Sequence, residues 1–272
     1  MKEYLAEIVG AVPRRDATNA MREYLQARAL QTLQDRGAWS SIAFMGGTAL
    51  RFLYRIPRFS EDLVFALEDQ SAGYDFAKLM EAVKTQFEHE GYDVALKFST
   101  KTTVNKAFIK FRGLEHELGL SPLPDQVFSI KVEVDTNPPA GAGLETTIIR
   151  RFVTLRLVHH DKSSLLAGKC AALLMREWLK GRDVYDLVWY LTNPEWPEPN
   201  EALLRNAFRQ GGRVDLLGDE SAWKAALVSR ISQEPWDHVL SDADRFFERP
   251  EDTWMLERDS VLSVLSARGW KA

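Results

Sequence analysis

Two short stretches contain residues that could bind a phosphate group or a metal ion. In the first, Gly46 and Gly47 stand between a predicted strand and a predicted helix, where the absence of side chains lets a ligand approach the backbone. Unpaired N–H groups at a helix start can bind phosphate, and the hydroxyl of Thr48 adds a donor. In the second, Asp62 begins a predicted strand, where its carboxylate could hold Mg²⁺ against a nucleotide phosphate.

These features alone do not establish a phosphate site, because a Gly-Gly pair is usually only a turn. The sequence also lacks the pattern G-x-x-x-x-G-K-[ST], so a P-loop ATPase is not supported.

The two stretches together resemble the signature of the AbiEii and MenT type of nucleotidyltransferase toxins. That signature is Gly-Gly-Thr-Ala-Leu followed by Arg-x-Ser-x-Asp-Leu-Asp-Phe, and it matches residues 46–50 and 58–65 except at one position. The resemblance continues in three further blocks, at 22–26, 166–173 and 180–187. It implies a mixed α/β fold, in which a nucleotidyltransferase-like domain with a mixed β-sheet is joined to a helical C-terminal domain.

The resemblance also implies a function. The chain would be the toxin of a toxin–antitoxin system, with a cognate antitoxin as its partner. It would transfer a nucleotide from a nucleoside triphosphate (NTP) to RNA, with the end of a tRNA as one candidate, using Mg²⁺ or Mn²⁺. Catalysis would come mainly from positioning and from stabilisation of charge.

The same resemblance assigns roles to individual residues. The residues that would bind the nucleotide are Gly46, Gly47, Thr48, Arg58, Ser60 and Lys169. The metal would be held by Asp62 and Glu133, with Asp135 as the reserve for Glu133. The catalytic set would be Asp62, Glu133, Lys169 and Asp183.

The sequence departs from the family pattern at Val64, where the family has a second aspartate. Residues 62 and 64 of a strand point to the same face, where two carboxylates would hold one or two metal ions. Valine cannot ligate a metal. The alternatives are an inactive descendant that still binds nucleotide or RNA, an enzyme with one weaker metal, or an engineered substitution at this position.

Each remaining candidate also has a purely structural interpretation. Glu133 belongs to the alternating segment 127–135, whose polar residues could simply face solvent. Lys169 could be a lysine at the edge of an apolar helix. Asp183 would suit the N-cap of a helix over 184–191, and Asp186, one turn later, could stabilise the same helix start. We rank Asp183 above Asp186.

The elements that would position these residues fall into two regions. Alternation and apolar runs predict strands at 41–45, 63–67, 92–98, 103–111 and 127–135 and a strand-rich stretch over 144–157, with helices between them. After residue 161 the pattern is helical, with predicted helices over 163–178, 184–191, 200–209, 219–232 and 252–268. We therefore predict domains over 1–158 and 159–272, with a cleft between them.

Composition and charge limit the classes of protein to which the chain could belong. The net charge of −4 means that RNA binding must use a local basic patch. The single cysteine, Cys170, excludes an internal disulfide, and no apolar run is long enough for a membrane helix. A cytoplasmic protein is the simplest interpretation. A transferase acting on a small molecule would carry the same motifs.

Overall fold

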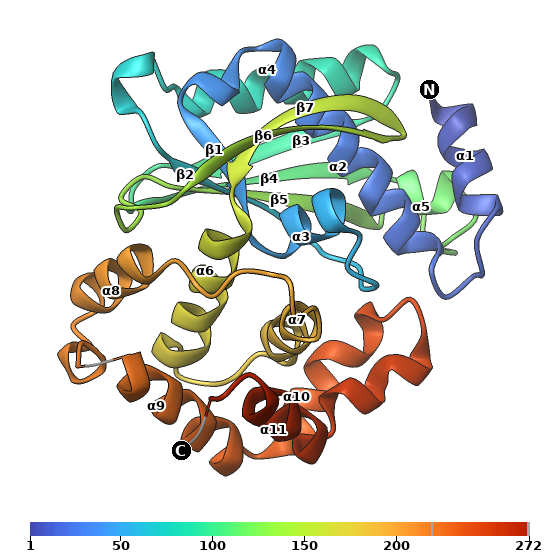
Figure 1. Ribbon diagram of the computed structural model, residues 1–272. Coiled ribbons are helices and arrows are strands. Elements are labelled where there is room, and N and C mark those ends of the chain that lie inside the picture. The colour runs from blue at the N-terminus through green and yellow to red at the C-terminus, as the bar shows by residue number, and fades with distance from the viewer. Residues whose placement is uncertain (219, 271–272) are drawn as a thin grey trace. The chain divides into compact units, whose positions relative to one another are not determined.

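The computed structural model describes residues 1–218 and 220–270 and divides into two compact units (Figure 1). Unit 1 contains the strands, and unit 2 is mainly helical, so the predicted mixed α/β fold is confirmed. Unit 1 comprises Met1–Leu53, Phe59–Pro138 and Thr146–His159, and unit 2 comprises Tyr54–Arg58, Pro139–Glu145 and His160–Ala272. The predicted domain ranges and the cleft stay predictions.

One mixed sheet runs through unit 1. Among the described residues its strands lie in the order β3-β4-β5-β2-β1-β7-β6. β2 pairs in parallel with β5 and antiparallel with β1, which is parallel to β7. The bounds are β1 (Ile42–Met45), β2 (Asp62–Leu67), β3 (Val94–Ser99), β4 (Val104–Arg112), β5 (Val127–Asp135), β6 (Leu144–Arg151) and β7 (Val153–His160).

The two faces of this sheet differ in polarity. The predicted alternation over 127–135 is confirmed in β5, whose even-numbered residues are buried and whose odd-numbered residues are partly or fully exposed. Helix α4 (Phe76–His89) packs on the buried face, where the rings of Phe87 and Phe111 are 4.9 Å apart. Helix α2 (Ala17–Asp35) contacts both α4 and β5. Most polar residues of β2, β4 and β5 lie on the opposite face, with Asn105 of β4 as a buried exception.

The other helices of unit 1 are short: α1 (Lys2–Gly10), α3 (Gly46–Tyr54) and α5 (Leu114–Glu117). The predicted strand-rich stretch over 144–157 forms two strands, because the backbone turns at Phe152, which has a φ of +60°.

Unit 2 is built from helices α6 (Lys162–Met175), α7 (Gly181–Leu191), α8 (Glu201–Gln210), α9 (Glu220–Gln233), α10 (Trp236–Ala243) and α11 (Arg258–Ala267). Helix α10 lies where the sequence pattern predicts no helix. The prediction of one helix over 252–268 is wrong, because the chain forms a 3-10 helix over Pro250–Leu256 and is extended at Glu257 before α11 begins.

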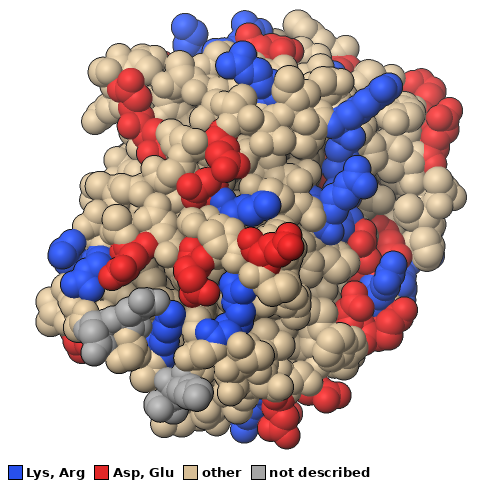
Figure 2. All heavy atoms as spheres, viewed as in Figure 1, with Lys and Arg blue, Asp and Glu red and all other residues tan. Residues whose placement is uncertain are grey.

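No helix in the described part of the chain is long and apolar enough to cross a membrane. Figure 2 shows that basic and acidic side chains are interspersed on the face turned to the viewer.

Candidate functional site

The turn between β1 and α3 is shaped by Gly46, whose φ of +81° lies in the left-handed region that favours glycine. A Cβ atom at this position would lie 3.5 Å from Cβ of Val64, an ordinary contact, so the backbone angle rather than space requires glycine. Because α3 begins at Gly46, the first N–H groups of this helix have no partner within the helix. A helix start of this kind can bind an anion.

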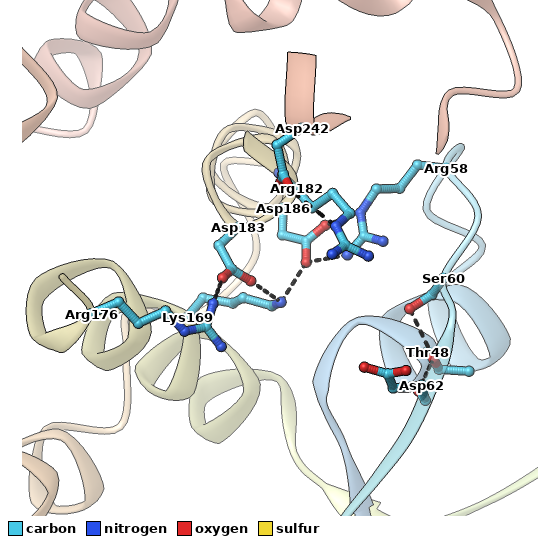
Figure 3. Close-up of polar contacts among 10 residues, drawn as sticks. All are labelled: Thr48, Arg58, Ser60, Asp62, Lys169, Arg176, Arg182, Asp183, Asp186 and Asp242. Atoms are coloured by element: carbon cyan, nitrogen blue, oxygen red, sulfur yellow. Dashed lines mark hydrogen bonds and ion pairs between the residues drawn. The ribbon is translucent and has the colours of Figure 1, made fainter. Parts of the chain in front are cut away.

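Thr48 fixes this turn to the strand that carries Asp62. Its buried hydroxyl hydrogen-bonds with Oγ of Ser60 at 2.8 Å and donates to the backbone carbonyl of Asp62 (Figure 3). Both hydroxyls are therefore engaged with the protein. The observed contacts of Thr48 and Ser60 position the turn at Gly46 against the start of β2. Direct contact of either residue with a nucleotide stays a prediction.

Polar residues of α2 also contact the segment that leads into β2 and its neighbours, a role that sequence reasoning missed. The buried amide of Gln26 donates to the carbonyls of Ser60 at 3.0 Å and Glu61 at 2.9 Å. Glu23, also buried, pairs with Arg51 and Arg151. The signal in the sequence was the presence of Glu23 and Gln26 among the apolar residues of the 21–33 helix.

Two carboxylates, Asp62 and Glu133, lie on the polar face of the sheet, and we call them the acid pair. Asp62 is in register with Lys131, and Val64 is in register with Glu133, so all four side chains share one face. The Lys131 ammonium is 2.8 Å from the Glu133 carboxylate and 3.9 Å from that of Asp62. Lys106 adds a second contact to Glu133 at 3.7 Å.

This donor set suits one divalent ion and not two. Mg²⁺ commonly uses one or two protein carboxylates together with substrate phosphates, and the acid pair supplies two. The third position on this face is the apolar side chain of Val64, and Lys131 lies between the acids. Within the described residues, no group of three or more His, Cys, Asp or Glu side chains could hold a metal. An ion bound here would have to displace the Lys131 ammonium.

Unit 2 holds a separate group of charges, which we call the Lys169 cluster: Arg58, Lys169, Arg176, Asp183 and Asp186. Lys169 contacts the carboxylates of Asp183 at 2.7 Å and Asp186 at 2.6 Å (Figure 3). Arg176 also pairs with Asp183. The cluster is therefore an ion-pair network in which both carboxylates are shared, Asp183 by Lys169 and Arg176 and Asp186 by Lys169 and Arg58.

Arg58 binds Asp186 through both ends of its guanidinium group, with Nε 2.6 Å from one carboxylate oxygen. Burial, the largest single influence, would lower the pKa of Arg58, but the charge of Asp186, its hydrogen bond to Arg58 and the charge of Asp183 together raise it. Arg58 is only 2% exposed, so a direct nucleotide contact stays a prediction. The sequence ranking placed Asp186 below Asp183, although Asp186 contacts both Lys169 and Arg58.

Asp183 is an internal residue of α7 and not its N-cap, so the N-cap interpretation is wrong. The helix begins earlier, at Gly181, with Lys180 at the cap position. Gly181 permits this start because a Cβ atom there would lie 1.8 Å from the carbonyl oxygen of Val239 in α10. Burial would raise the pKa of Asp183, but Lys169 and Arg176 overcome this and hold the pKa of its carboxyl well below its usual range.

The fold and these residues can be compared with known proteins. The model of the family described as nucleotidyl transferase AbiEii toxin, type IV toxin–antitoxin system, matches residues 28–258. Among solved structures, MenT4, a nucleotidyltransferase toxin from Mycobacterium tuberculosis H37Rv, is 16% identical over 98% of this chain and 89% of its own, with a TM-score of 0.56. JHP933 from Helicobacter pylori is 16% identical over 92% and 94%, with a TM-score of 0.50. No curated protein sequence matches significantly.

Proposed function

This chain belongs to the AbiEii nucleotidyl transferase toxin family of type IV toxin–antitoxin systems, and from that premise we propose that it transfers a nucleotide from an NTP to RNA. The observation that carries the proposal is the Gly46 turn, which Thr48 holds against the backbone at Asp62. This contact brings a helix start suited to phosphate close to a carboxylate suited to a divalent ion.

In the proposed reaction, the N–H groups of Gly46 and Gly47 bind the triphosphate. A hydroxyl of the acceptor RNA attacks the α-phosphate, a new phosphorus–oxygen bond forms, and pyrophosphate leaves as the proton passes to solvent. Asp62 and Glu133 would hold Mg²⁺ or Mn²⁺, which neutralises charge on the leaving pyrophosphate when it is bound. The end of a tRNA is a candidate acceptor.

The Lys169 cluster has a proposed part as well. Lys169 would bind a phosphate group of the nucleotide, while Asp183 and Asp186 keep its ammonium in place. A cognate antitoxin is the partner that membership of this family suggests.

Transfer of labelled nucleotide tests the proposal directly. The full chain is incubated with Mg²⁺, each of the four NTPs labelled at the α-phosphate, and total RNA. We expect label in RNA, and we expect Asp62→Ala to abolish it while Asp125→Ala, which changes an exposed acid outside the site, does not. Absence of label with every NTP would reject the transferase. Label that appears only in small molecules would instead identify a small-molecule acceptor.

A second candidate function is that of a non-catalytic protein that binds nucleotide or RNA. It is favoured by Val64 in place of a carboxylate and by the Lys131 ammonium between the acids of the pair. This candidate predicts NTP or RNA binding in calorimetry without incorporation of label.

A further inference from the structure

An exposed phenylalanine lies on the polar face of the sheet in unit 1. Phe108 of β4 has 36% of its surface exposed, whereas its neighbours Ala107 and Ile109 are fully buried. Alternate residues of a strand point to opposite faces, so Phe108 lies on the face away from the core under α4. Its ring therefore lies outside the core under α4 and is partly open to solvent.

Lysines surround this ring. Phe108 is in register with Lys97 on β3 and with Lys131 on β5. Adjacent strands lie about 5 Å apart, so both lysine stems flank the ring. Along β4 itself, Lys106 and Lys110 stand two positions before and after Phe108, on the same face. We call these residues, Lys97, Lys106, Phe108, Lys110 and Lys131, the Phe108 face.

The charge of this face differs from that of the whole chain, which is −4. The carboxylates on the same side of β2 and β5 are Asp62, Glu133 and Asp135, and the first two contact Lys131 or Lys106. Lys97 and Lys110 form no ion pair with any residue that the structure describes. Their charges are thus available to an anion from outside the chain.

We propose that the Phe108 face binds a single-stranded segment of RNA, with one base stacked on Phe108 and flanking phosphates bound by Lys97 and Lys110. An aromatic ring on an open sheet face, with cations around it, is a recurrent way to bind single strands, because every base has a face that can stack. This proposal rests on the proposed function, since the bound RNA is the acceptor.

The register of the strands links this face to the acid pair. The row Lys97, Phe108, Lys131 and Asp62 crosses β3, β4, β5 and β2, and the next row contains Lys106, Glu133 and Val64. A strand of RNA lying across the first row is therefore led from Phe108 toward Asp62. The Phe108 face would hold the acceptor while its end lies next to the acids.

Fluorescence anisotropy of a labelled single-stranded RNA tests the face with the full chain. We expect Phe108→Leu to weaken binding about tenfold, because stacking on the ring is lost, and Phe108→Tyr to retain it. The matched control is Phe98→Leu on β3, which is 41% exposed but lies on the other face, with its ring 6.3 Å from that of Phe76. A single-stranded DNA of the same sequence, used as competitor, shows whether the face distinguishes RNA from DNA.

A second pair of variants tests the cations independently of the ring. The double variant Lys97→Gln with Lys110→Gln should lower the slope of log affinity against log salt by about 1.4, since each phosphate contact to a single strand contributes about 0.7. Lys84→Gln, on the exposed surface of α4, should leave the slope unchanged. Wild-type affinity and slope in both Phe108→Leu and the double variant would overturn the proposal.

The labelled-nucleotide assay separates this inference from the proposed function. Label transfer by the wild type, together with RNA binding that is insensitive to the Phe108 and lysine variants, would overturn the face and leave the transferase. RNA binding that is lost in Phe108→Leu, without any label transfer by the wild type, would support the face and reject the transferase.

Discussion

Two lysines in this chain each lie between two carboxylates, but in opposite surroundings. Lys131 bridges the acid pair on an open sheet face, where the side chain of Asp62 is 41% exposed. Lys169 bridges Asp183 and Asp186, which are almost completely buried. The same combination of one lysine and two carboxylates should therefore contribute differently to stability in the two places. Exposed pairs contribute little stability and rearrange readily, whereas a buried charge left without its partner is costly.

The strongest test of this comparison is Arg58→Met, which removes the bidentate partner of Asp186. We expect a loss of about 3 kcal/mol in the free energy of unfolding, because the carboxylate of Asp186 is fully buried and loses its bidentate partner. Urea denaturation followed by circular dichroism measures it. The matched change on the open face, Lys131→Met, should cost less than about 1 kcal/mol. Equal losses in the two variants would refute the contrast.

The pH dependence of stability gives a second test of the buried ion pairs in the Lys169 cluster. The pKa of Asp183 is lowered by folding, so its charge contributes fully above the ordinary carboxyl pKa, about 3.9, and the contribution falls as the pH drops below it. Stability lost in this way amounts to at most about 1.4 kcal/mol per pH unit. The advantage of the wild type over Asp183→Asn should therefore shrink between pH 4 and pH 3. A constant advantage between pH 5 and pH 3 would contradict the ion-pair account.

On the exposed sheet face that carries the acid pair, Val64→Asp should restore the second aspartate of the family pattern. We expect roughly tenfold tighter Mn²⁺ binding, because an added unit charge about 4 Å away contributes about 1 kcal/mol even at the dielectric constant of water, and direct coordination adds to this. Electron paramagnetic resonance of free Mn²⁺ measures the affinity, with Val127→Asp as the control, because Val127 is exposed at the start of β5, four positions before Lys131. An unchanged affinity would mean that the metal geometry of the family does not apply to this chain.

The smallest effect is expected for Lys131→Met, measured by the same Mn²⁺ titration. Removing the ammonium between the acids should tighten binding by about fivefold, since this cation repels the ion and occupies its place. Lys84→Met, which changes the surface of α4, serves as the comparison. Weaker binding in Lys131→Met would show that the lysine assists the ion and does not compete with it.

Local patterns predicted much of the fold, because local side-chain chemistry decides those elements. The alternation of β5 and the apolar run of β2 both predicted strands, and the Gly-Gly pair predicted the turn into α3. The break at Glu257 could not be predicted because the periodicity of α11 continues back through the preceding 3-10 helix. A pattern of apolar residues does not report a change of backbone angle.

The contacts of the candidate site could not be predicted in the same way. Lys131 lies between the acids only because β2 and β5 pair in one particular register. Arg58 meets Asp186 although 128 positions separate them in the chain. Such partners are fixed by tertiary structure, and the family signature, which names residues but not their partners, left both contacts unforeseen.

Gly181 has a consequence for how mutations in this chain would be interpreted. It carries no functional group, yet even one methyl group there would collide with the carbonyl of Val239 and force α7 away from α10. Since Asp183 and Asp186 lie on α7, a genetic screen for loss of activity would select changes at Gly181 as readily as changes at the aspartates. Such a position would be mistaken for part of the chemistry, although its contribution is the spacing between two helices.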